Sequence, residues 1–398
     1  MKRSPAAITG MGCICGAGDT LGDCIDALFQ GSRNPSPPSR FTSSHGVSYP
    51  VFEAPETAIR PELKDIEHIS LTGKLAITAA YEALANAGLE SHEVKGKKIG
   101  VCIGTTVGSV MNDIAFYAEF CNGGAPGLEA INRFLRSNPA ALLAKEFGLT
   151  GPCQTVVNAC SSSTDAIGIA ASWVQSGRCD MVIAGGTDEL SRVTYNGFIS
   201  LMITDETPCK PFDRDRKGLN LGEGSAMLIL ESEQSWGCRK KNPRAIVLGY
   251  GSSSDAHHLT APHPNGDGLR RAISEALNIS GASPDSIAFV NAHGTGTPDN
   301  DRVESKVFSE LLPGIPFVST KGFTGHTLGA AGAIEAAFTV ACLERSMIPG
   351  SAGFTNPDPD LPATPVSIPT AVKGSMAISQ SLAFGGCNSV LIFGNGRE

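Results

Sequence analysis

The sequence contains no long apolar segment. No run approaches the roughly 18 to 20 apolar residues that a helix needs to cross a bilayer. Gly10 and Gly12 follow the start too closely for the apolar region of a signal peptide. We therefore expect a protein that has no membrane span and stays in the cytoplasm.

Aromatic and charged residues are also scarce. Of the 398 residues, 6% are aromatic and 18% are charged, whereas 41% are hydrophobic and 46 are glycine. This balance is ordinary for a soluble protein with a packed core, and it excludes a disordered chain or a fibre. The formal net charge of −8 and the lack of a basic run argue against a nucleic-acid partner.

The twelve cysteines lie singly along the chain, and no Cys-x-x-Cys motif occurs. We interpret most of them as small buried hydrophobic residues in a reducing cytosol. The closest pair is Cys13 and Cys15. We interpret these two as pointing to opposite faces of a strand, where their thiols would neither form a disulfide nor bind a metal.

Short β-branched runs alternate with helices rich in small residues, which is the pattern of an α/β protein. The runs expected to form buried strands are Ile99–Ile103, Thr155–Asn158, Met181–Ala184, Ala226–Leu230, Ala245–Leu248, Ile287–Asn291, Phe317–Thr320 and Val390–Phe393. Helices are predicted over Thr72–Ala87 and after an Asn138 cap followed by Pro139.

The polar segment Glu231–Arg244 is the best candidate for a boundary between domains. It divides the chain into residues 1–240 and 241–398, and the two halves resemble each other. In each half a strand is followed by a short junction with a potentially reactive residue, and then by a helix rich in Gly and Ala. We interpret this as an internal duplication in which the two junctions face each other.

Three polar residues follow strands at glycine-rich junctions: Cys160, His293 and His326. Cys160 precedes the first turn of a helix, where unpaired N–H groups and the positive end of the helix dipole face its sulfur. This position is expected to lower the pKa of the thiol and make it a nucleophile. Any one of the three is more simply explained as a packing residue, but the three together indicate a catalytic site.

These junctions belong to longer motifs. The motifs are residues 158–163, residues 292–298 with Asn300 and Asp301, residues 321–332, residues 211–216 with 222–224, and residues 384–388. Through them the chain resembles the β-ketoacyl-acyl-carrier-protein synthases, the elongating type II condensing enzymes of the thiolase superfamily. The resemblance runs from Ala7 to the C-terminal strand, and it implies an α/β thiolase fold whose duplicated halves form a five-layer αβαβα sandwich.

The resemblance assigns catalytic roles. Cys160 would take an acyl group from a carrier-protein thioester. His293 and His326 would stabilise, through neutral Nε2–H donors, the enolate that malonyl-acyl carrier protein forms when it loses CO2. The backbone N–H groups of Cys160 and Phe384 would bind the oxyanion of the condensation step. The chain would then be an acyltransferase of fatty-acid, polyene or polyketide elongation.

Further residues are assigned supporting and binding roles by the same resemblance. Lys321 would order the two histidines, with Glu335 as its ion-pair partner. The residues implied for the pocket are Val107 at the floor of the acyl site, Thr295 and Thr297 at the malonyl entrance, and Thr260 at the mouth of the channel.

The implied partner is acyl carrier protein, which brings the phosphopantetheine, so no cofactor or metal of the chain's own is expected. The candidates for a basic docking surface are Lys64, Lys74, Arg133 and Arg136. A homodimer in which strands of the two first halves pair is the default expectation. A heterodimer with a paralogous subunit stays open.

Several positions differ from the usual pattern of housekeeping synthases. Asn158 replaces Thr, Gly322 stands where Ser or Ala is frequent, Cys387 replaces Thr, and the segment from Gly186 to Pro211 is short. These differences favour a specialised synthase for polyenes or other secondary metabolites.

Two alternatives come from different classes. A thiolase would use a second cysteine as its base, and a non-catalytic chain-length partner would lack the nucleophile. Cys160 together with two histidines favours an active decarboxylating enzyme over both.

Overall fold

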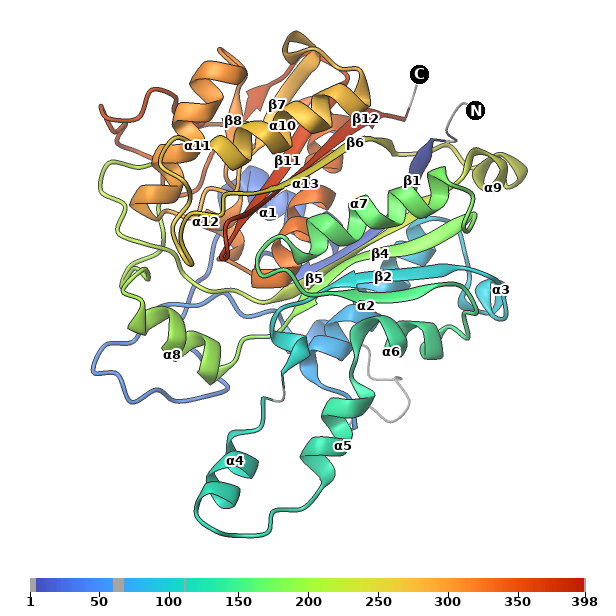
Figure 1. Ribbon diagram of the computed structural model, residues 1–398, viewed down its shortest axis with the longest axis vertical. Helices are drawn as coiled ribbons and strands as arrows, with labels where there is room; N and C mark the ends of the chain where they lie inside the picture. Colours follow the sequence, from blue (N-terminus) through green and yellow to red (C-terminus); the bar gives the residue numbers. More distant parts are fainter. Residues whose placement is uncertain (1–4, 60–67, 111, 397–398) are drawn as a thin grey trace.

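Ten strands form one mixed sheet in the computed structural model, which describes residues 5–59, 68–110 and 112–396 (Figure 1). They are β1 (Ala6–Cys15), β2 (Gly100–Gly104), β3 (Cys153–Val156), β4 (Met181–Asp188), β5 (Gly224–Glu231), β6 (Ala245–Ser254), β7 (Ile287–Asn291), β8 (Phe317–Val318), β11 (Met376–Ala383) and β12 (Cys387–Asn395). A separate pair is formed by β9 (Met347–Ile348) and β10 (Thr370–Ala371).

Helices cover and separate the two halves of the sheet. They are α1 (Leu21–Gln30), α2 (Leu71–Asn86), α3 (Ser91–Val94), α4 (Ile114–Cys121), α5 (Glu129–Arg136), α6 (Pro139–Glu146), α7 (Ser162–Gln175), α8 (Arg192–Ser200), α9 (Glu233–Cys238), α10 (Asp267–Ser280), α11 (Pro298–Leu311), α12 (Lys321–Thr324) and α13 (Ala331–Arg345), with short 3-10 turns η1 (Glu56–Ala58), η3 (Val107–Ser109), η4 (Pro284–Ser286) and η5 (Leu328–Ala330). As predicted, the Asn138 side chain caps α6 by accepting a hydrogen bond from the Ala141 N–H at 3.0 Å. No helix of the described ranges has both the length and the apolar character that crossing a bilayer requires.

The order of the strands confirms the duplication. The first half runs β3-β2-β4-β5-β1, and the second half repeats it as β8-β7-β11-β12-β6. The orientations repeat as well, because β2 and β7 are parallel to both of their neighbours whereas β5 and β12 are antiparallel to both of theirs. The halves join where residues 6–8 of β1 pair with residues 245–247 of β6.

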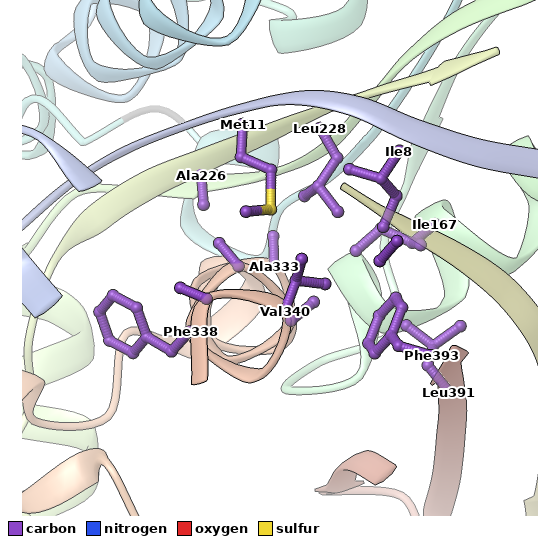
Figure 2. Close-up of a cluster of buried hydrophobic side chains, with 14 of the residues drawn as sticks. Ile8, Met11, Ile167, Ala226, Leu228, Ala333, Phe338, Val340, Leu391 and Phe393 are labelled. Atoms are coloured by element: carbon purple, nitrogen blue, oxygen red, sulfur yellow. The ribbon is translucent and has the colours of Figure 1, made fainter. Parts of the chain in front are cut away.

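The layers follow from this duplication. Helices α2 and α6 cover the outer face of the first half, α10 and α11 cover that of the second, and α7 and α13 lie between them (Figure 1). Figure 2 shows the central core, where Ala333 and Val340 of α13 lie among Met11, Leu228 and Phe393 from both halves of the sheet. The predicted five-layer thiolase architecture is therefore confirmed.

Two predicted strands differ from the structure. The run at 155–158 was expected to be a buried strand, but β3 ends at Val156, lies at the edge of the sheet, and exposes Cys153 and Gln154. Its position explains the exposure, since among the described residues only β2 pairs with it. The run at 317–320 is shortened to β8 because the chain turns into α12 there.

Helices α4 and α5 project away from the layers (Figure 1). They and the segment between them carry large apolar side chains in contact with solvent, including Phe120, Leu128 and Leu135, which are 64%, 64% and 69% exposed. Apolar surface of this kind, concentrated on one projection, is typical of a protein interface.

The N-terminal ends of α7 and α13 approach each other closely. A Cβ atom on Gly332 would lie 2.0 Å from Oγ1 and 2.9 Å from the backbone nitrogen of Thr164, so only glycine fits. The Ser163 hydroxyl accepts a hydrogen bond from the Ala333 N–H at 2.9 Å. These contacts fix the two helix starts, and with them the junctions that precede the helices.

We expect Gly332→Ala to lower the free energy of unfolding by about 1–3 kcal/mol, because the added methyl group has no space between the helices. The matched control is Gly197→Ala in α8, where a Cβ would meet no atom within 4 Å. That control should be neutral or slightly stabilising, because alanine favours a helix more than glycine does. Denaturant unfolding of both variants measures the difference, and equal stabilities would contradict the close approach.

Candidate active site

Cys160 lies in a sharp turn between β3 and α7. The preceding Ala159 has a φ of +46°, a left-handed conformation that costs a non-glycine residue about 1–2 kcal/mol. The turn is held by the Ser162 hydroxyl, which accepts from the Asn158 N–H at 2.8 Å and donates to the Ala159 carbonyl at 2.6 Å. As a result, Cys160 is only 5% exposed and stands just before the first turn of α7.

The structure brings both predicted histidines to this sulfur. His326 Nε2 lies 3.0 Å from Cys160 Sγ. The rings of His293 and His326 are 5.1 Å apart and nearly perpendicular, at 84°. Both histidines are buried. The junctions of the two halves therefore face each other, as the duplication predicted.

Hydrogen bonds determine which ring nitrogen of each histidine carries the proton. His326 Nδ1 accepts from the Leu328 N–H at 3.3 Å. His293 Nδ1 lies 3.1 Å from Nζ of Lys321, and an ammonium group can only donate. Each histidine therefore presents Nε2–H to the site. Burial, and then the charge of Lys321, lower the pKa of both imidazoles well below the usual value, so both are neutral.

Lys321 is a buried cation at the centre of the histidine environment. Its ammonium donates to the His293 carbonyl at 2.6 Å and contacts the Glu335 carboxylate and His293 Nδ1, so all three of its protons have acceptors. Burial raises the pKa of Glu335 to about 7, although Lys321 favours the charged carboxylate. The predicted Lys321–Glu335 ion pair is present.

The predicted low pKa of Cys160 is wrong for the resting site. Burial raises the pKa of this thiol to about 11, and the opposing effects of Lys321 and of a backbone hydrogen bond from Phe384 are smaller. The sequence shows that Cys160 precedes a helix, which lowers a thiol pKa, but it does not show the burial, which raises the pKa by more. Cys160 is therefore a neutral thiol near pH 7.

A cavity of about 160 Å³ opens beside these residues. Its wall includes seven of the predicted site residues, Cys160, Thr260, His293, Thr295, Thr297, His326 and Phe384, together with Phe198, Leu219, Asn300, Leu382 and Cys387. Thr260 is at the exposed rim, and its N–H donates to His258 Nδ1 at 3.2 Å. Lys321 and Glu335 lie behind the wall.

Val107 does not line this cavity. It is buried in a separate apolar cluster with Tyr195 and Ile199 of α8. Leu219 belongs both to this cluster and to the cavity wall, so Val107 lies beyond the wall on the side of α8.

Asp188 is a buried residue that sequence reasoning missed. Its carboxylate accepts from the Thr105 hydroxyl at 2.6 Å, the Val107 N–H at 2.8 Å and the Gly329 N–H at 2.6 Å. It therefore ties the loop after β2 to the turn after His326. Burial raises its pKa to about 6. Its place at the end of a buried strand is the signal that would have indicated it.

Glu304 was also missed. Its carboxylate accepts from the N–H groups of His293 and Gly294, at 2.7 and 2.6 Å, and from the side chains of Asn300 and Gln380, at 2.6 and 2.7 Å. These bonds hold the turn that carries His293. Asn300 and Asp301 were already part of the predicted motif, and the position of Glu304 on the same face of α11 is the signal that would have indicated it.

Two of the unusual residues contact each other. The Asn158 side chain hydrogen-bonds the Cys387 thiol beside the cavity, and it donates to Asp165 Oδ2 at 2.6 Å. Gly322 has a separate explanation, because a Cβ there would lie 2.4 Å from the Ala352 carbonyl oxygen.

The structure describes three of the four predicted basic docking residues. Lys64 lies outside the described residues. Lys74 and Arg133 line a second cavity of about 280 Å³, where Asp113 and Glu189 partly balance their charge. Arg136 is exposed at the end of α5.

We expect alkylation of Cys160 by iodoacetamide to accelerate about tenfold per pH unit from pH 8 to 10. The reason is that only the thiolate reacts, and the thiolate fraction grows with pH until the raised pKa is reached. Peptide mass spectrometry gives the rate at Cys160, with free N-acetylcysteine as the reference thiol. A Cys160 rate that levels off together with the reference would contradict the raised pKa.

We expect Glu335→Leu to lower the free energy of unfolding by about 3–5 kcal/mol, because it leaves the buried Lys321 ammonium without its counter-charge. The double variant Lys321→Met/Glu335→Leu should recover most of this loss, since no unpaired charge remains. Denaturant unfolding of the four proteins in this cycle measures the coupling. Additive effects of the two substitutions would show that the ion pair does not hold the site together.

Comparisons with known proteins agree with this geometry. The family profile "Beta-ketoacyl synthase, N-terminal domain" matches residues 3–235, and "Beta-ketoacyl synthase, C-terminal domain" matches residues 244–355. The chain is 34% identical to 3-oxoacyl-[acyl-carrier-protein] synthase 2 of Synechocystis sp., over 99% of this chain and 98% of that protein. It is 33% identical to Nodulation protein E of Rhizobium meliloti, over 97% and 98% of the two chains.

Solved structures give the same result. The ishigamide ketosynthase/chain length factor superimposes with a TM-score of 0.92 at 30% identity, covering 99% of both chains. The ketosynthase ApeO in complex with its chain length factor ApeC, from Xenorhabdus doucetiae, gives a TM-score of 0.87 at 32% identity, covering 98% of both chains. The chain therefore belongs to the β-ketoacyl synthase family, the thiolase-fold acyltransferases that elongate chains in fatty-acid and polyketide biosynthesis without a cofactor of their own.

Proposed function

We propose that Cys160 carries the growing acyl chain and that His293 and His326 decarboxylate the malonyl unit that extends it. One observation carries this proposal: a buried thiol lies 3.0 Å from the Nε2 atom of one neutral histidine, with a second histidine ring 5.1 Å further on, in the wall of one cavity. A thiol nucleophile beside two N–H donors suits a reaction that forms first a thioester and then an enolate.

In the first half-reaction the Cys160 sulfur attacks the acyl thioester of the carrier protein. The new bond joins the sulfur to the acyl carbon, the old carbon–sulfur bond breaks, and the thiol proton leaves with the pantetheine sulfur. The hydrogen bonds from Phe384 N–H and His326 Nε2–H, which point at the resting sulfur, favour its negative charge as the proton departs. The raised pKa thus does not prevent the exchange.

In the second half-reaction malonyl-acyl carrier protein loses CO2, and the electron pair moves to the α-carbon and the thioester oxygen. The Nε2–H groups of His293 and His326 donate to that oxygen. The enolate carbon then attacks the acyl carbonyl, and the sulfur of Cys160 leaves as a thiolate that takes a proton from solvent. The oxyanion of this step is held by backbone N–H groups of Cys160 and Phe384, a type of interaction that lowers a barrier by about 3–4 kcal/mol per donor.

The neutral state of the histidines supports these roles. A neutral imidazole with Nδ1 already occupied keeps its Nε2–H fixed, so the donor is in place before the charge develops. The Lys321 ammonium occupies Nδ1 of His293, and the Leu328 N–H occupies Nδ1 of His326. Thr295 and Thr297, whose hydroxyls lie 2.8 Å apart on the wall, are positioned to contact the malonyl group.

His293→Ala should separate the two half-reactions. We expect the variant to accept an acyl group on Cys160 at close to the normal rate, because His293 does not contact the sulfur in the first step. Release of CO2 from malonyl-acyl carrier protein should fall by about 10²-fold or more, since one enolate donor is lost. Intact-protein mass spectrometry measures the first step, and trapping of labelled CO2 measures the second.

Two controls accompany this experiment. Cys160→Ala should fold normally but form no acyl adduct and no condensation product, whereas His92→Ala, on the exposed helix α3, should be unaffected. Undiminished CO2 release by His293→Ala would overturn its assignment, and normal condensation by Cys160→Ala would overturn the nucleophile.

We further propose that the chain acts as a dimer through β3. The edge of β3 has unpaired backbone groups among the described residues, and Val157 beside it is 56% exposed. The apolar projection of α4 and α5 supplies additional surface to bury. A homodimer is the default. Light scattering of the isolated chain tests it: a monomer would favour pairing with a paralogous subunit. The ketosynthase ApeO is in complex with a different chain, its chain length factor ApeC.

The unusual residues near the site favour a specialised substrate. Asn158 and Cys387 change one side of the cavity, and the short segment between β4 and residue 211 carries α8, which packs against Val107. We expect unsaturated acyl chains on the carrier protein to be elongated faster than saturated chains of equal length. Competition between the two primers measures this preference, and equal rates would contradict it.

Three further expectations are part of the proposal. Residues 1–240 and 241–398 act as the two halves that contribute the cysteine and the histidines. Arg133, Arg136 and Lys74 are exposed or line a cavity near the α4–α5 projection, which supports docking of an acidic carrier protein there.

All twelve cysteines lie among the described residues and none forms a disulfide, which supports a reducing cytoplasmic location.

A further inference from the structure

A cluster of three cysteines lies in the core outside the candidate active site. The sulfur atoms of Cys13, Cys15 and Cys24 all lie within 4.8 Å of one another, and the pair Cys15–Cys24 is 3.6 Å apart. All three residues are fully buried. Within the described ranges, this is the group of His, Cys, Asp and Glu side chains whose donor atoms converge closely enough to hold one ion.

The expectation that Cys13 and Cys15 point apart is wrong. Residues two positions apart on a strand share a face, and both thiols lie on the face of β1 that looks into the central layer, as Met11 does in Figure 2. Cys24 joins them from the first turns of α1, which follows β1 directly. Sequence spacing alone does not show this convergence, because the turn between β1 and α1 brings Cys24 back.

A tight turn after β1 holds two of the three sulfurs together. The Cys24 sulfur lies 3.6 Å from that of Cys15 and 3.5 Å from the Gly18 carbonyl oxygen. The turn is closed by Cys15 N–H to Gly18 carbonyl and Gly18 N–H to Cys15 carbonyl bonds of 3.1 and 3.0 Å. This turn therefore fixes the position of Cys15 relative to the start of α1, which carries Cys24.

One carboxylate fixes both segments that carry the thiols. Glu82 of α2 accepts from the Cys13 N–H at 2.8 Å through Oε2 and from the Leu21 N–H at 2.9 Å through Oε1. It therefore fixes the spacing between β1 and the start of α1. The three sulfurs are held by the fold in advance, which lowers the entropic cost of collecting them around an ion.

A cavity of about 240 Å³ reaches the neighbourhood of the cluster. Its wall contains Met11 beside Cys13 on β1, Leu21 and Ile25 beside Cys24 on α1, and the carboxylates of Glu82 and Glu344. The cysteines themselves are behind this wall.

We propose that Cys13, Cys15 and Cys24 bind one soft, closed-shell metal ion, Cu⁺, through three sulfur ligands. Thiolate ligands select Cu⁺ and Zn²⁺ among the biological metals. Metal–sulfur bonds of about 2.3 Å separate ligand sulfurs by roughly 3.8–4.0 Å, a spacing that lies between the 3.6 Å separation of Cys15 and Cys24 and the 4.8 Å limit within which all three sulfurs lie. Zn²⁺ almost always takes a fourth ligand, and no histidine or carboxylate among the described residues joins this group.

Binding needs no redox step. Three sulfur–metal bonds form, and each thiol that binds releases its proton to solvent. The bound ion would join β1 to α1 and would stabilise the folded chain in proportion to its affinity.

Native mass spectrometry of the full-length protein tests the site. The exposed cysteines Cys121, Cys153 and Cys238, together with Cys160, are first alkylated, and the protein is equilibrated anaerobically with Cu⁺ in the presence of a competing chelator. We expect one Cu⁺ per chain in the wild type and in the matched control Cys342→Ala, which removes an isolated buried thiol. Cys13→Ala and Cys24→Ala should retain none.

A wild type that retains no Cu⁺, or cluster variants that retain as much as the wild type, would overturn the proposal. Preference for Zn²⁺ over Cu⁺ in a parallel titration would overturn the three-coordinate assignment. X-ray absorption of the Cu⁺-loaded wild type decides the ligands even where a variant fails to fold. Three sulfur neighbours support the site, whereas nitrogen or oxygen neighbours contradict it.

Discussion

The contact between the starts of α7 and α13 determines the rest of the site. Each half of the duplicated fold presents its reactive residue just before a central helix, so the two residues meet only if the two helices meet. Gly332 allows the approach to Thr164, and the Ser163 hydroxyl fixes the first turn of α13. With that packing in place, Cys160 from one half and His326 from the other come within 3.0 Å.

The electrostatics of the resting site follow from its burial. Desolvation raises the pKa of Cys160 and lowers those of both histidines, so the thiol and the imidazoles are all neutral. Lys321 is charged but is paired with Glu335 behind the wall. This site presents oriented reactive groups that carry no net charge. It is therefore suited to a reaction in which negative charge appears only transiently, first on a departing sulfur and then on an enolate oxygen.

The sequence was sufficient to predict the architecture and those reactive residues that lie in a recognisable motif. The repeat of a strand, a junction and a small-residue helix predicts both the duplication and the facing of Cys160 and His326. Features that depend on burial or on strand order were not predictable in the same way. The position of β3 at the edge of the sheet, and the desolvation that outweighs the helix start at Cys160, both depend on which segments pack around them.

Supporting groups were the hardest to predict. Asp188 and Glu304 have no reactive motif, and their roles depend on backbone N–H groups contributed by segments far away in the chain. Contacts that form across a turn are equally hard to predict from the sequence. The sulfur of Cys24 lies beside those of Cys13 and Cys15 only because the turn between β1 and α1 brings it there.

The central claim is that Cys160 carries the acyl chain. Its most direct test is the mass of the intact protein after incubation with an acylated carrier protein, without malonyl donor, followed by mapping of the modified peptide. The account predicts one acyl group per chain, attached to Cys160 and removed when malonyl-acyl carrier protein is added. An unmodified protein, or an acyl group on another residue, would contradict it.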